Sequence, residues 1–206
     1  MISKNISEGL NGSPNIPGDK SISHRSIIIP SISNGICEID NYLKSEDVLN
    51  TLQAFILMGV KVVKENNKII IFGKGLNSLQ KPKKNIYLGN SGTSARLLTG
   101  LLSSQSFDTV LTGDSSLSSR PMNRIADPLT KMNAKITTNE GTMPLSIKGV
   151  NLVNAEIDIN IPSAQIKSGL ILAALNTFGK TKIIEHNITR DHTEIMLSAF
   201  GADINI

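Results

Sequence analysis

The sequence predicts a mixed α/β fold built from one strand–helix–strand–helix–strand–strand unit that recurs along the chain. The first observation is the order of apolar runs and helical patterns, which is shared by residues 14–73 and 85–149 and begins again in residues 156–206. The second is a motif that ends the second helix of each unit, namely Met58-Gly59-Val60, Met132-Asn133-Ala134 and Phe200-Gly201-Ala202. We therefore expect three related units, the third of them incomplete.

The first unit is expected to open with an extended strand that turns at Gly18 into a helix. Ser21 is placed to cap a helix that starts near Ile22, because its hydroxyl can accept a bond from an unpaired N–H group. Pro30 is expected to close the apolar run of that helix. The remaining elements are predicted as a strand, a helix capped by Ser45 and a hairpin, over residues 36–42, 45–59, 60–63 and 68–72.

The second and third units repeat this order after a linker at residues 74–84 that is rich in Lys and Pro. The second unit is predicted as strand, helix, strand, polar loop, helix and hairpin, over residues 85–88, 93–102, 109–112, 114–119, 121–133, 134–138 and 143–148. The third is predicted as strand, helix, strand and helix, over residues 156–161, 163–176, 181–185 and 190–200. Only five residues follow Gly201, too few for the closing strands, so we expect a truncated chain.

The composition excludes several classes of protein. With 39% hydrophobic and 18% charged residues the chain is typical of a soluble globular protein, and its 3% aromatic content requires an aliphatic core. A net charge of +4, without a basic tract or interleaved aromatic residues, argues against nucleic-acid binding. No apolar run reaches the roughly 18 residues that a membrane span needs, and no targeting segment is visible, so we expect a cytoplasmic protein.

Cysteine and histidine carry no catalytic or metal signal. Cys37 is the only cysteine, so no disulfide can form within the chain, and its place in a strand-like run indicates a buried structural thiol. The three histidines, His24, His186 and His192, lack the spacing of metal ligands. We therefore expect no metal site.

The chemical signal lies in cations at the predicted helix starts. A helix start offers unpaired N–H groups and the positive end of the helix dipole, which together attract anions. Lys20 would stand at the first such start, and Arg25, four residues after Ser21, would share its face. The arrangement recurs at later starts with Arg96, Arg120, Arg124, Lys167 and Arg190. We expect the starts to converge on one multi-anion site; the alternative is a set of ordinary solvated surface charges.

Five segments, in order, resemble the 5-enolpyruvylshikimate-3-phosphate (EPSP) synthase family, also called 3-phosphoshikimate 1-carboxyvinyltransferases. They read Gly-Asp-Lys-Ser-Ile-Ser-His-Arg at 18–25, Leu-Gly-Asn-Ser-Gly-Thr at 88–93, Ser-Arg-Pro-Met at 119–122, Ser-Ala-Gln-Ile-Lys-Ser at 163–168 and Thr-Arg-Asp-His-Thr-Glu at 189–194. Each segment alone is moderately specific, and five in the family's order are strongly so. The resemblance covers the chain from about residue 14 onward.

The resemblance implies an enolpyruvyl-transferase-like domain, an inside-out barrel of three βαβαββ units, as one of two similar domains joined by a hinge. Residues 1–13 would be a lead or hinge that packs with the missing second domain, and residues 14–206 the substrate-binding domain. The implied enzyme is a monomeric glyphosate target without cofactor or metal. It transfers the enolpyruvyl group of phosphoenolpyruvate to the 5-hydroxyl of shikimate 3-phosphate, in the pathway to aromatic amino acids. Its acid and base groups belong to the missing domain, so we expect no catalytic residue here and no turnover by this chain alone.

The substrate ligands carry over motif by motif. The resemblance implies that shikimate 3-phosphate is bound by Lys20, Ser21, Arg25, Ser163, Ala164, Gln165 and Arg190. It implies that phosphoenolpyruvate is bound by Lys20, Asn90, Gly92, Thr93, Arg120 and Gln165. Other members use serine and tyrosine in place of Arg190. A glycine at the position of Gly92 leaves room for glyphosate in the family, whereas the 189–194 segment resembles the more tolerant branch, so the two clues disagree on sensitivity.

Simpler interpretations stay open. Asn90 and Gly92 are also ordinary turn residues, Ser163 is also a helix cap, and Gln165 a solvated first-turn residue. Asp47 is either a partner of its helix dipole or an acid–base group. For the whole chain, one alternative is UDP-N-acetylglucosamine enolpyruvyl transferase, which typically opens with a Gly-Ala-Lys-Asn signature and has a cysteine or aspartate on a mobile loop. The other is a noncatalytic phosphometabolite-binding module.

Overall fold

The computed structural model describes residues 12–14, 16–65 and 68–206, so most of the predicted lead at residues 1–13 lies outside the described residues. The described chain is a mixed α/β structure, as the sequence predicts. Its elements, in order, are α1 (Lys20–Ile32), β1 (Asn34–Asp40), α2 (Glu46–Leu57), β2 (Lys61–Glu65), β3 (Lys68–Lys74), β4 (Ile86–Tyr87), α3 (Gly92–Ser103), β5 (Thr109–Thr112), α4 (Ser115–Ser118), α5 (Asn123–Thr130), β6 (Lys135–Asn139), β7 (Thr142–Lys148), β8 (Glu156–Ile159), α6 (Ala164–Ala174), β9 (Lys182–Glu185) and α7 (His192–Ala199).

The strands form three sheets, of which the first two share a pairing order. The first sheet is antiparallel with the order β1-β3-β2, and the second has the order β4-β5-β7-β6, in which β4 and β5 are parallel. The β1-β3-β2 order therefore corresponds to β5-β7-β6. The third sheet is the parallel pair β8-β9. Both predicted hairpins, β2–β3 and β6–β7, are confirmed.

The closing glycines of the first two sheets also correspond. A Cβ on Gly73, in β3, would lie 2.2 Å from the carbonyl oxygens of Pro30 and Ser33 at the end of α1. A Cβ on Gly149, just after β7, would lie 2.2 Å from the carbonyl oxygen of Gln105, just after α3. In both places the last strand crosses a helix end so closely that only glycine fits.

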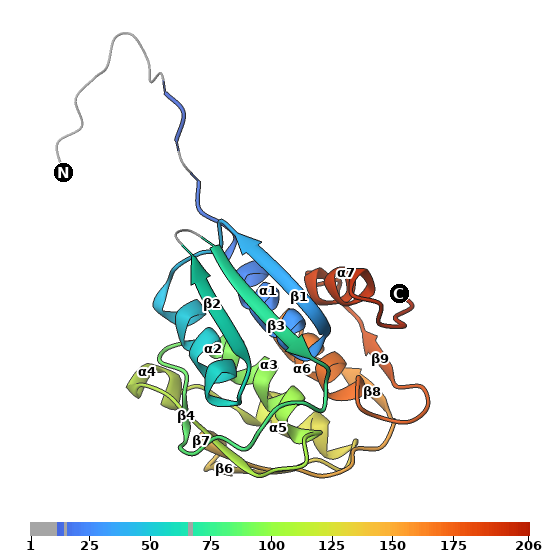
Figure 1. The fold of residues 1–206 in the computed structure, drawn as a ribbon. Helices are drawn as coiled ribbons and strands as arrows, with labels where there is room; N and C mark the ends of the chain where they lie inside the picture. The colour runs from blue at the N-terminus through green and yellow to red at the C-terminus, as the bar shows by residue number, and fades with distance from the viewer. Residues whose placement is uncertain (1–11, 15, 66–67) are drawn as a thin grey trace, which may run out of the picture.

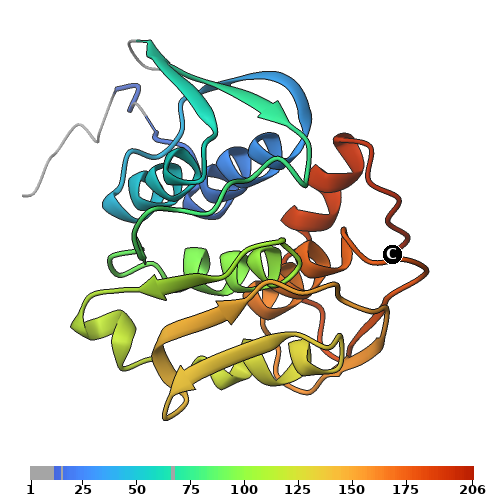
Figure 2. The ribbon, with the colours of Figure 1, turned by 60° about the horizontal axis from the view of Figure 1, so that its bottom comes forward.

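The helices occupy the interior, with sheets on the outside. Figure 2 shows α1 and α3 between the β1-β3-β2 sheet and the four-stranded sheet, and Figure 1 shows α6 beside α3. The tightest helix contact is between α3 and α6, where a Cβ on Gly100 would lie 1.8 Å from the carbonyl oxygen of Gly169. The two helix backbones therefore touch at these glycines. The surrounding core is aliphatic, as predicted, and its largest buried side chain is Phe55.

The entry into α1 differs from the prediction. Residues 12–14 and 16–19 form no strand, and Asn15 lies outside the described part. The segment is instead fastened beyond the end of β1, where the Gly18 N–H donates to the carbonyl of Asn41 over 3.1 Å. A Cβ on Gly18 would lie 2.3 Å from that oxygen, so this glycine serves a close approach. Asp19, not Ser21, caps the helix by accepting the Ile22 N–H over 2.8 Å.

Three other boundaries also differ. Pro30 lies inside α1, which continues to Ile32, because the whole run from residue 27 to 32 is buried and packing outweighs the missing donor. The polar loop at 114–119 contains the short helix α4, whose first turn is capped by Asp114. Pro121 precedes α5, which begins at Asn123, since the Met122 N–H is held by the Gly141 carbonyl over 2.7 Å.

Two further predictions concern single features. Cys37 lies in β1 as expected but is only half-buried, and burial raises the pKa of its thiol. Residues 202–206 form no strand after α7. Within the described residues, every helix is too short or too polar to span a bilayer.

Candidate functional site

The starts of α1, α3, α6 and α7 meet around α6. The Gln165 side chain, in the first turn of α6, accepts from Arg96 Nη1 over 2.9 Å and donates to Thr93 Oγ1 over 3.0 Å, which links α6 to the start of α3. On its other side, Ser168 Oγ accepts from Arg25 Nη2 of α1 over 2.7 Å. Arg190, just before α7, donates to Ser21 Oγ over 3.4 Å. The predicted convergence of helix starts is therefore present.

At the start of α1 the cation already has a carboxylate partner. Lys20 Nζ forms an ion pair with Asp47 in the first turn of α2; the side chains are 51% and 16% exposed. Of the two interpretations of Asp47, the structure supports electrostatic pairing in the first turn, here with Lys20 as well as with the dipole. Lys20 remains open to solvent.

Arg25 is buried and ties three helices together. It is 3% exposed, and it donates from Nε to Thr193 Oγ1 of α7, from Nη1 to the Ser21 carbonyl and from Nη2 to Ser168 Oγ of α6. Burial lowers the pKa of its guanidinium, and Glu194 opposes that shift. These contacts use three of five N–H donors.

The start of α3 forms a close cluster of arginines over a glycine. Ser91 caps the helix by accepting the Ser94 N–H over 3.1 Å. A Cβ on Gly92 would lie 2.7 Å from Arg96 Nη1 and 3.0 Å from Arg120 Nη1, so both guanidinium groups lie against this glycine. Burial lowers the pKa of Arg96, and the neighbouring charges of Arg120 and Arg124 lower it further.

Asn90 is the support of this cluster. Its Oδ1 accepts from Arg120 Nη2, and its Nδ2 donates to Asp114 Oδ2 over 3.0 Å. The Leu117 N–H and the Asn90 amide both donate to Asp114 and lower the pKa of that carboxyl. Asn90 is therefore more than a turn residue, because it sets the place of the Arg120 guanidinium.

The start of α6 borders a hollow of about 480 Å³. Its lining is formed by Pro162, Ser163, Ala164, Gln165, Ile188, Thr189 and Arg190, which include four of the predicted shikimate 3-phosphate ligands. Ser163 caps α6 by accepting the Ile166 N–H over 3.4 Å, so the simpler interpretation of this residue is confirmed. A cap hydroxyl at a helix start still faces the place where an anion binds.

Lys167 was predicted among the converging cations, and this is wrong. Its side chain is buried between Glu185 and Glu194, with Nζ 2.8 Å from a carboxylate oxygen of each. Glu185 also accepts a hydrogen bond from Thr189, in the loop that carries Arg190. Two carboxylates neutralise this lysine, and it instead fastens α6 to β9 and α7.

The five arginines of the sequence all lie at this convergence. Arg25 and Arg190 stand on one side of the α6 start, and Arg96, Arg120 and Arg124 on the other. Within the described residues, none of the five forms an ion pair with a carboxylate. No three His, Cys, Asp or Glu side chains of the described part are grouped as metal ligands. The site is suited to an anion with more than one charged group.

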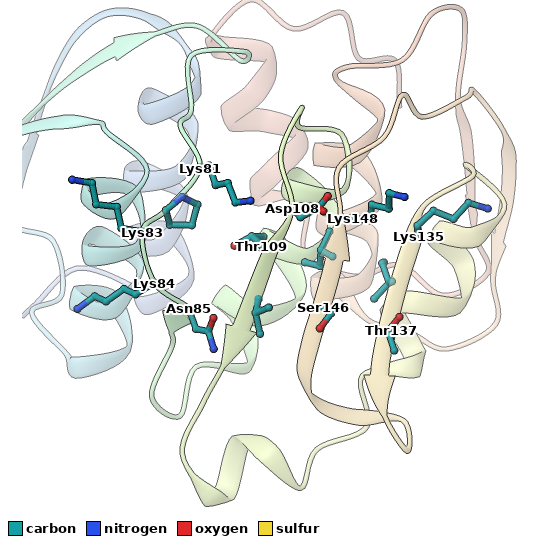
Figure 3. Close-up of a pocket in the computed structure, with 14 residues that line it drawn as sticks. Lys81, Lys83, Lys84, Asn85, Asp108, Thr109, Lys135, Thr137, Ser146 and Lys148 are labelled. Carbon is teal, nitrogen blue, oxygen red and sulfur yellow. The ribbon is translucent and has the colours of Figure 1, made fainter.

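A separate hollow of about 560 Å³ lies away from these helix starts, between the 81–85 segment and the strands β5, β6 and β7. Figure 3 shows Lys83 and Lys84 pointing to one side and Lys135 and Lys148 to the other, whereas Lys81 points toward the start of β5. None of the residues in the five motifs lines it. We therefore do not assign the functional site to this hollow.

Several residues of the site had no clear signal in the sequence. Asp114, Ser168 and Thr193 act through Asn90 and Arg25, and Asp47 acts through Lys20. Ser168 and Thr193 lie inside the 163–168 and 189–194 motifs, which could have singled them out. Asp114 and Asp47 are polar residues at helix starts, and nothing local distinguishes them from ordinary capping residues.

The comparisons with known proteins agree with one another. A family model described as EPSP synthase (3-phosphoshikimate 1-carboxyvinyltransferase) matches residues 4–206. Two proteins named 3-phosphoshikimate 1-carboxyvinyltransferase, from Ruthia magnifica subsp. Calyptogena magnifica and from Oenococcus oeni, are 50% and 49% identical over 96% of this chain and 46% of their own length. The solved EPSP synthase of Acinetobacter baumannii is similar with a TM-score of 0.90 and 49% identity, over 95% of this chain and 45% of that one. The chain spans about half the length of these relatives.

Proposed function

The chain belongs to the EPSP synthase (3-phosphoshikimate 1-carboxyvinyltransferase) family, and from that membership we propose that it forms the shikimate 3-phosphate side of that enzyme's site. The whole enzyme would transfer the enolpyruvyl group of phosphoenolpyruvate to the 5-hydroxyl of shikimate 3-phosphate and release phosphate. The match to this family, and the Gly18-Asp19-Lys20-Ser21 segment, favour this over the UDP-N-acetylglucosamine enzyme.

Shikimate 3-phosphate would bind at the hollow beside α6. Ser163, Ala164 and Gln165 offer the first turn of α6 there, and Arg190 in the same lining offers a guanidinium. Lys20, Ser21 and the buried Arg25 would complete the site from α1. The dianionic phosphate would find the Arg190 guanidinium and the start of α6 within one hollow, which supports its assignment to the Arg190 side.

Phosphoenolpyruvate would bind at the start of α3. Asn90, Gly92 and Thr93 would form the loop that lines its pocket, and Arg120 would clamp the ligand. Gln165 and Lys20 would lie between it and the other substrate. Arg96, held between Gln165 and the Gly92 carbonyl at 2.9 and 3.1 Å, brings a second guanidinium. The two arginines supply the positive charge that a phosphate and a carboxylate require.

The chemistry itself would need the rest of the enzyme. In an addition–elimination, the 5-hydroxyl gives up its proton as its oxygen adds to C2 of phosphoenolpyruvate, and C3 gains a proton. The tetrahedral intermediate then loses phosphate from C2 and a proton from C3, which restores the double bond. These proton transfers need acid and base groups, which we assign to the second domain. We further propose that residues 14–206 form most of one inside-out barrel of three βαβαββ units, that the chain alone does not turn over, and that the whole enzyme is a cytoplasmic monomer.

The observation that carries this proposal is the set of five arginines near the starts of α1, α3 and α7, without a carboxylate partner among the described residues. It is tested by calorimetric titration of shikimate 3-phosphate into the chain, followed by phosphoenolpyruvate. We expect saturable binding of the first ligand, weakened at least tenfold by Arg190→Ala because a charged hydrogen bond is lost, and unchanged by the exposed-surface control Lys182→Ala.

The opposite result would be a folded chain that binds neither ligand, even when the second half of a relative is supplied. Binding of phosphate, sulfate and shikimate 3-phosphate with equal affinity would instead support a noncatalytic phosphometabolite-binding module. Supplying the second half also tests the enzyme directly, because release of phosphate is then expected.

A further inference from the structure

A chain of buried side-chain hydrogen bonds joins α1, α2 and α3 behind the helix starts. His24 Nδ1 lies 2.8 Å from Thr51 Oγ1, Thr51 Oγ1 lies 2.6 Å from Ser94 Oγ, and Ser94 Oγ lies 2.6 Å from Ser91 Oγ. All four residues are at most 1% exposed. Polar groups are costly to bury unless they are paired, so a row of four buried polar side chains indicates a specific structural role. We refer to these four residues as the His24–Ser91 network.

The network reaches both parts of the proposed phosphoenolpyruvate site. Its inner member Thr51 has Oγ1 3.1 Å from the backbone carbonyl of Asp47, whose carboxylate pairs with Lys20. Its end at Ser91 is the cap of α3 and directly precedes Gly92. The network therefore connects the first turn of α2, which holds Lys20, to the loop at residues 90–93.

The hydrogen positions in the network follow from counting donors. Thr51 sits in a helix and donates to the carbonyl four residues earlier, so its oxygen accepts from its other two neighbours. One of these is Ser94, which in turn accepts from Ser91. The other is His24, which must then carry its proton on Nδ1.

This arrangement also accounts for an unpaired atom. His24 Nε2 is buried and has no hydrogen-bond partner among the described residues. With the proton on Nδ1, Nε2 carries only a lone pair, and an unpaired acceptor is less costly than an unpaired N–H. The imidazole is neutral, since burial lowers the pKa of His24 to about 4. The charge of Asp47 raises this pKa, and the charges of Lys20 and Arg25 lower it.

We propose that the His24–Ser91 network is a positioning device that holds the loop at residues 90–93 in place relative to Lys20, with His24 as the neutral Nδ1–H tautomer. The four side chains touch no substrate and act through Ser91 and Asp47. The proposal deepens the proposed function and rests on it in one respect, because Lys20 and the loop at residues 90–93 lie where phosphoenolpyruvate is assigned. The network itself is a property of the chain and can be measured without a ligand.

The test uses a matched pair of buried threonines. Thr51→Val removes the hydroxyl that joins three helices, whereas Thr99→Val removes one whose bond, among the described residues, is to the Ala95 carbonyl within α3. Amide hydrogen exchange is followed at Gly92 and Ser94. We expect Thr51→Val to accelerate exchange there about tenfold more than Thr99→Val, as expected for the loss of one buried hydrogen bond, and Thr51→Ser to restore the slow rate.

Nitrogen-15 spectra of the unmodified chain test the tautomer, and do so even if Thr51→Val fails to fold. A protonated Nδ1 and an unprotonated Nε2 on His24 are expected; the reverse assignment would overturn the proposed direction of the network. Equal exchange at Gly92 and Ser94 in the two valine variants would overturn the positioning role.

A ligand arm separates this inference from the proposed function. Phosphoenolpyruvate is titrated in the presence of shikimate 3-phosphate, with the second half of a relative supplied. We expect about tenfold weaker binding of phosphoenolpyruvate in Thr51→Val, and little change in Thr99→Val or Thr51→Ser. If the exchange results hold but the unmodified chain binds no phosphoenolpyruvate, the proposed function fails and the network stands.

Discussion

The starts of α1 and α3 precede corresponding strands, β1 and β5, in sheets of corresponding order, yet they treat their cations differently. At α1, Lys20 is paired with Asp47, and Arg25 is buried in bonds to Thr193, Ser168 and a carbonyl. At α3, Arg96 and Arg120 lie together against Gly92 and have only neutral hydrogen-bond partners within the described residues.

This difference indicates a division of labour between two copies of one local design. At α1 both cations already have partners on other helices, Lys20 with one in α2 and Arg25 with others in α6 and α7. At α3 the guanidinium groups repel each other, and burial together with the charges of Arg120 and Arg124 lowers the pKa of Arg96. An anion bound there would relieve that repulsion, so the start of α3 should gain more from a ligand than the start of α1.

Gly100→Ala should have the largest effect, because it separates α3 from α6. Its Cβ would lie 1.8 Å from the Gly169 carbonyl oxygen, so α3 and α6 would have to move apart and Gln165 would leave Arg96 and Thr93. We expect a loss of about 3 kcal/mol or more in the free energy of unfolding, measured by denaturant titration. Gly12→Ala is the control, because no atom lies within 4 Å of its added Cβ. Equal stability of the two variants would contradict the contact.

Acid should have the second-largest effect, because it acts on His24 in the network that connects the starts of α1 and α3. The pKa of His24 is lowered from 6.5 to about 4 on folding, chiefly by burial, so the unfolded chain binds its proton more readily. The stabilisation is complete above pH 6.5 and is lost as the pH falls toward 4, up to roughly 3 kcal/mol. Denaturant midpoints across this range should show the loss. His24→Asn should remove the part of the pH dependence of stability that is due to His24. An unchanged slope in that variant would assign the effect to other groups.

Gly92→Ala should disturb only the α3 start. The new methyl group would lie 2.7 Å from Arg96 Nη1 and 3.0 Å from Arg120 Nη1, and both side-chain ends can move away. Stability should therefore change little, while affinity for phosphoenolpyruvate falls about tenfold, or about 1.4 kcal/mol. Calorimetry in the presence of shikimate 3-phosphate measures this, and the affinity for shikimate 3-phosphate is the internal control. A fall of equal size for both ligands would argue against separate subsites.

Asp47→Asn should have the smallest effect on stability. The pair with Lys20 is half exposed on the lysine side, and such pairs contribute about 0.5 kcal/mol. A double-mutant cycle with Lys20→Met measures the pair, and the stability term should fade at high salt. A coupling of several kcal/mol would show that the start of α1 depends on this pair far more than its exposure suggests.

Much of the fold could be predicted from local patterns. Period-two and helical spacing, with Gly59 and Gly201 at positive φ after their helices, gave the order of the elements except for the strand expected before α1 and the short helix α4. The errors occurred where a distant group changes a local preference. Asp19 is the cap rather than Ser21, and Pro30 stays inside α1 because its surroundings are buried.

Residues from separate motifs lie close together in the fold, but the sequence could not assign partners to charges. Lys167 and Arg190 were both read as cations at helix starts, yet Lys167 lies between two glutamates and Arg190 borders the hollow beside α6. The difference depends on which side chains β9 and α7 bring within about 3 Å, and no local pattern contains that distance.

The sequence by itself determined the repeat, the helices and hairpins, and the family to which the chain belongs, because these depend on spacing along the chain and on short motifs. Only the tertiary structure decided which cations stay available to a ligand, since a charge is neutralised by neighbours that the fold brings to it. It also decided that Thr51 and His24, unremarked in the sequence as a pair, meet at 2.8 Å behind two helix starts. Burial and pairing across elements are properties of the folded chain, and they separate cations held by carboxylates from those without a carboxylate partner among the described residues.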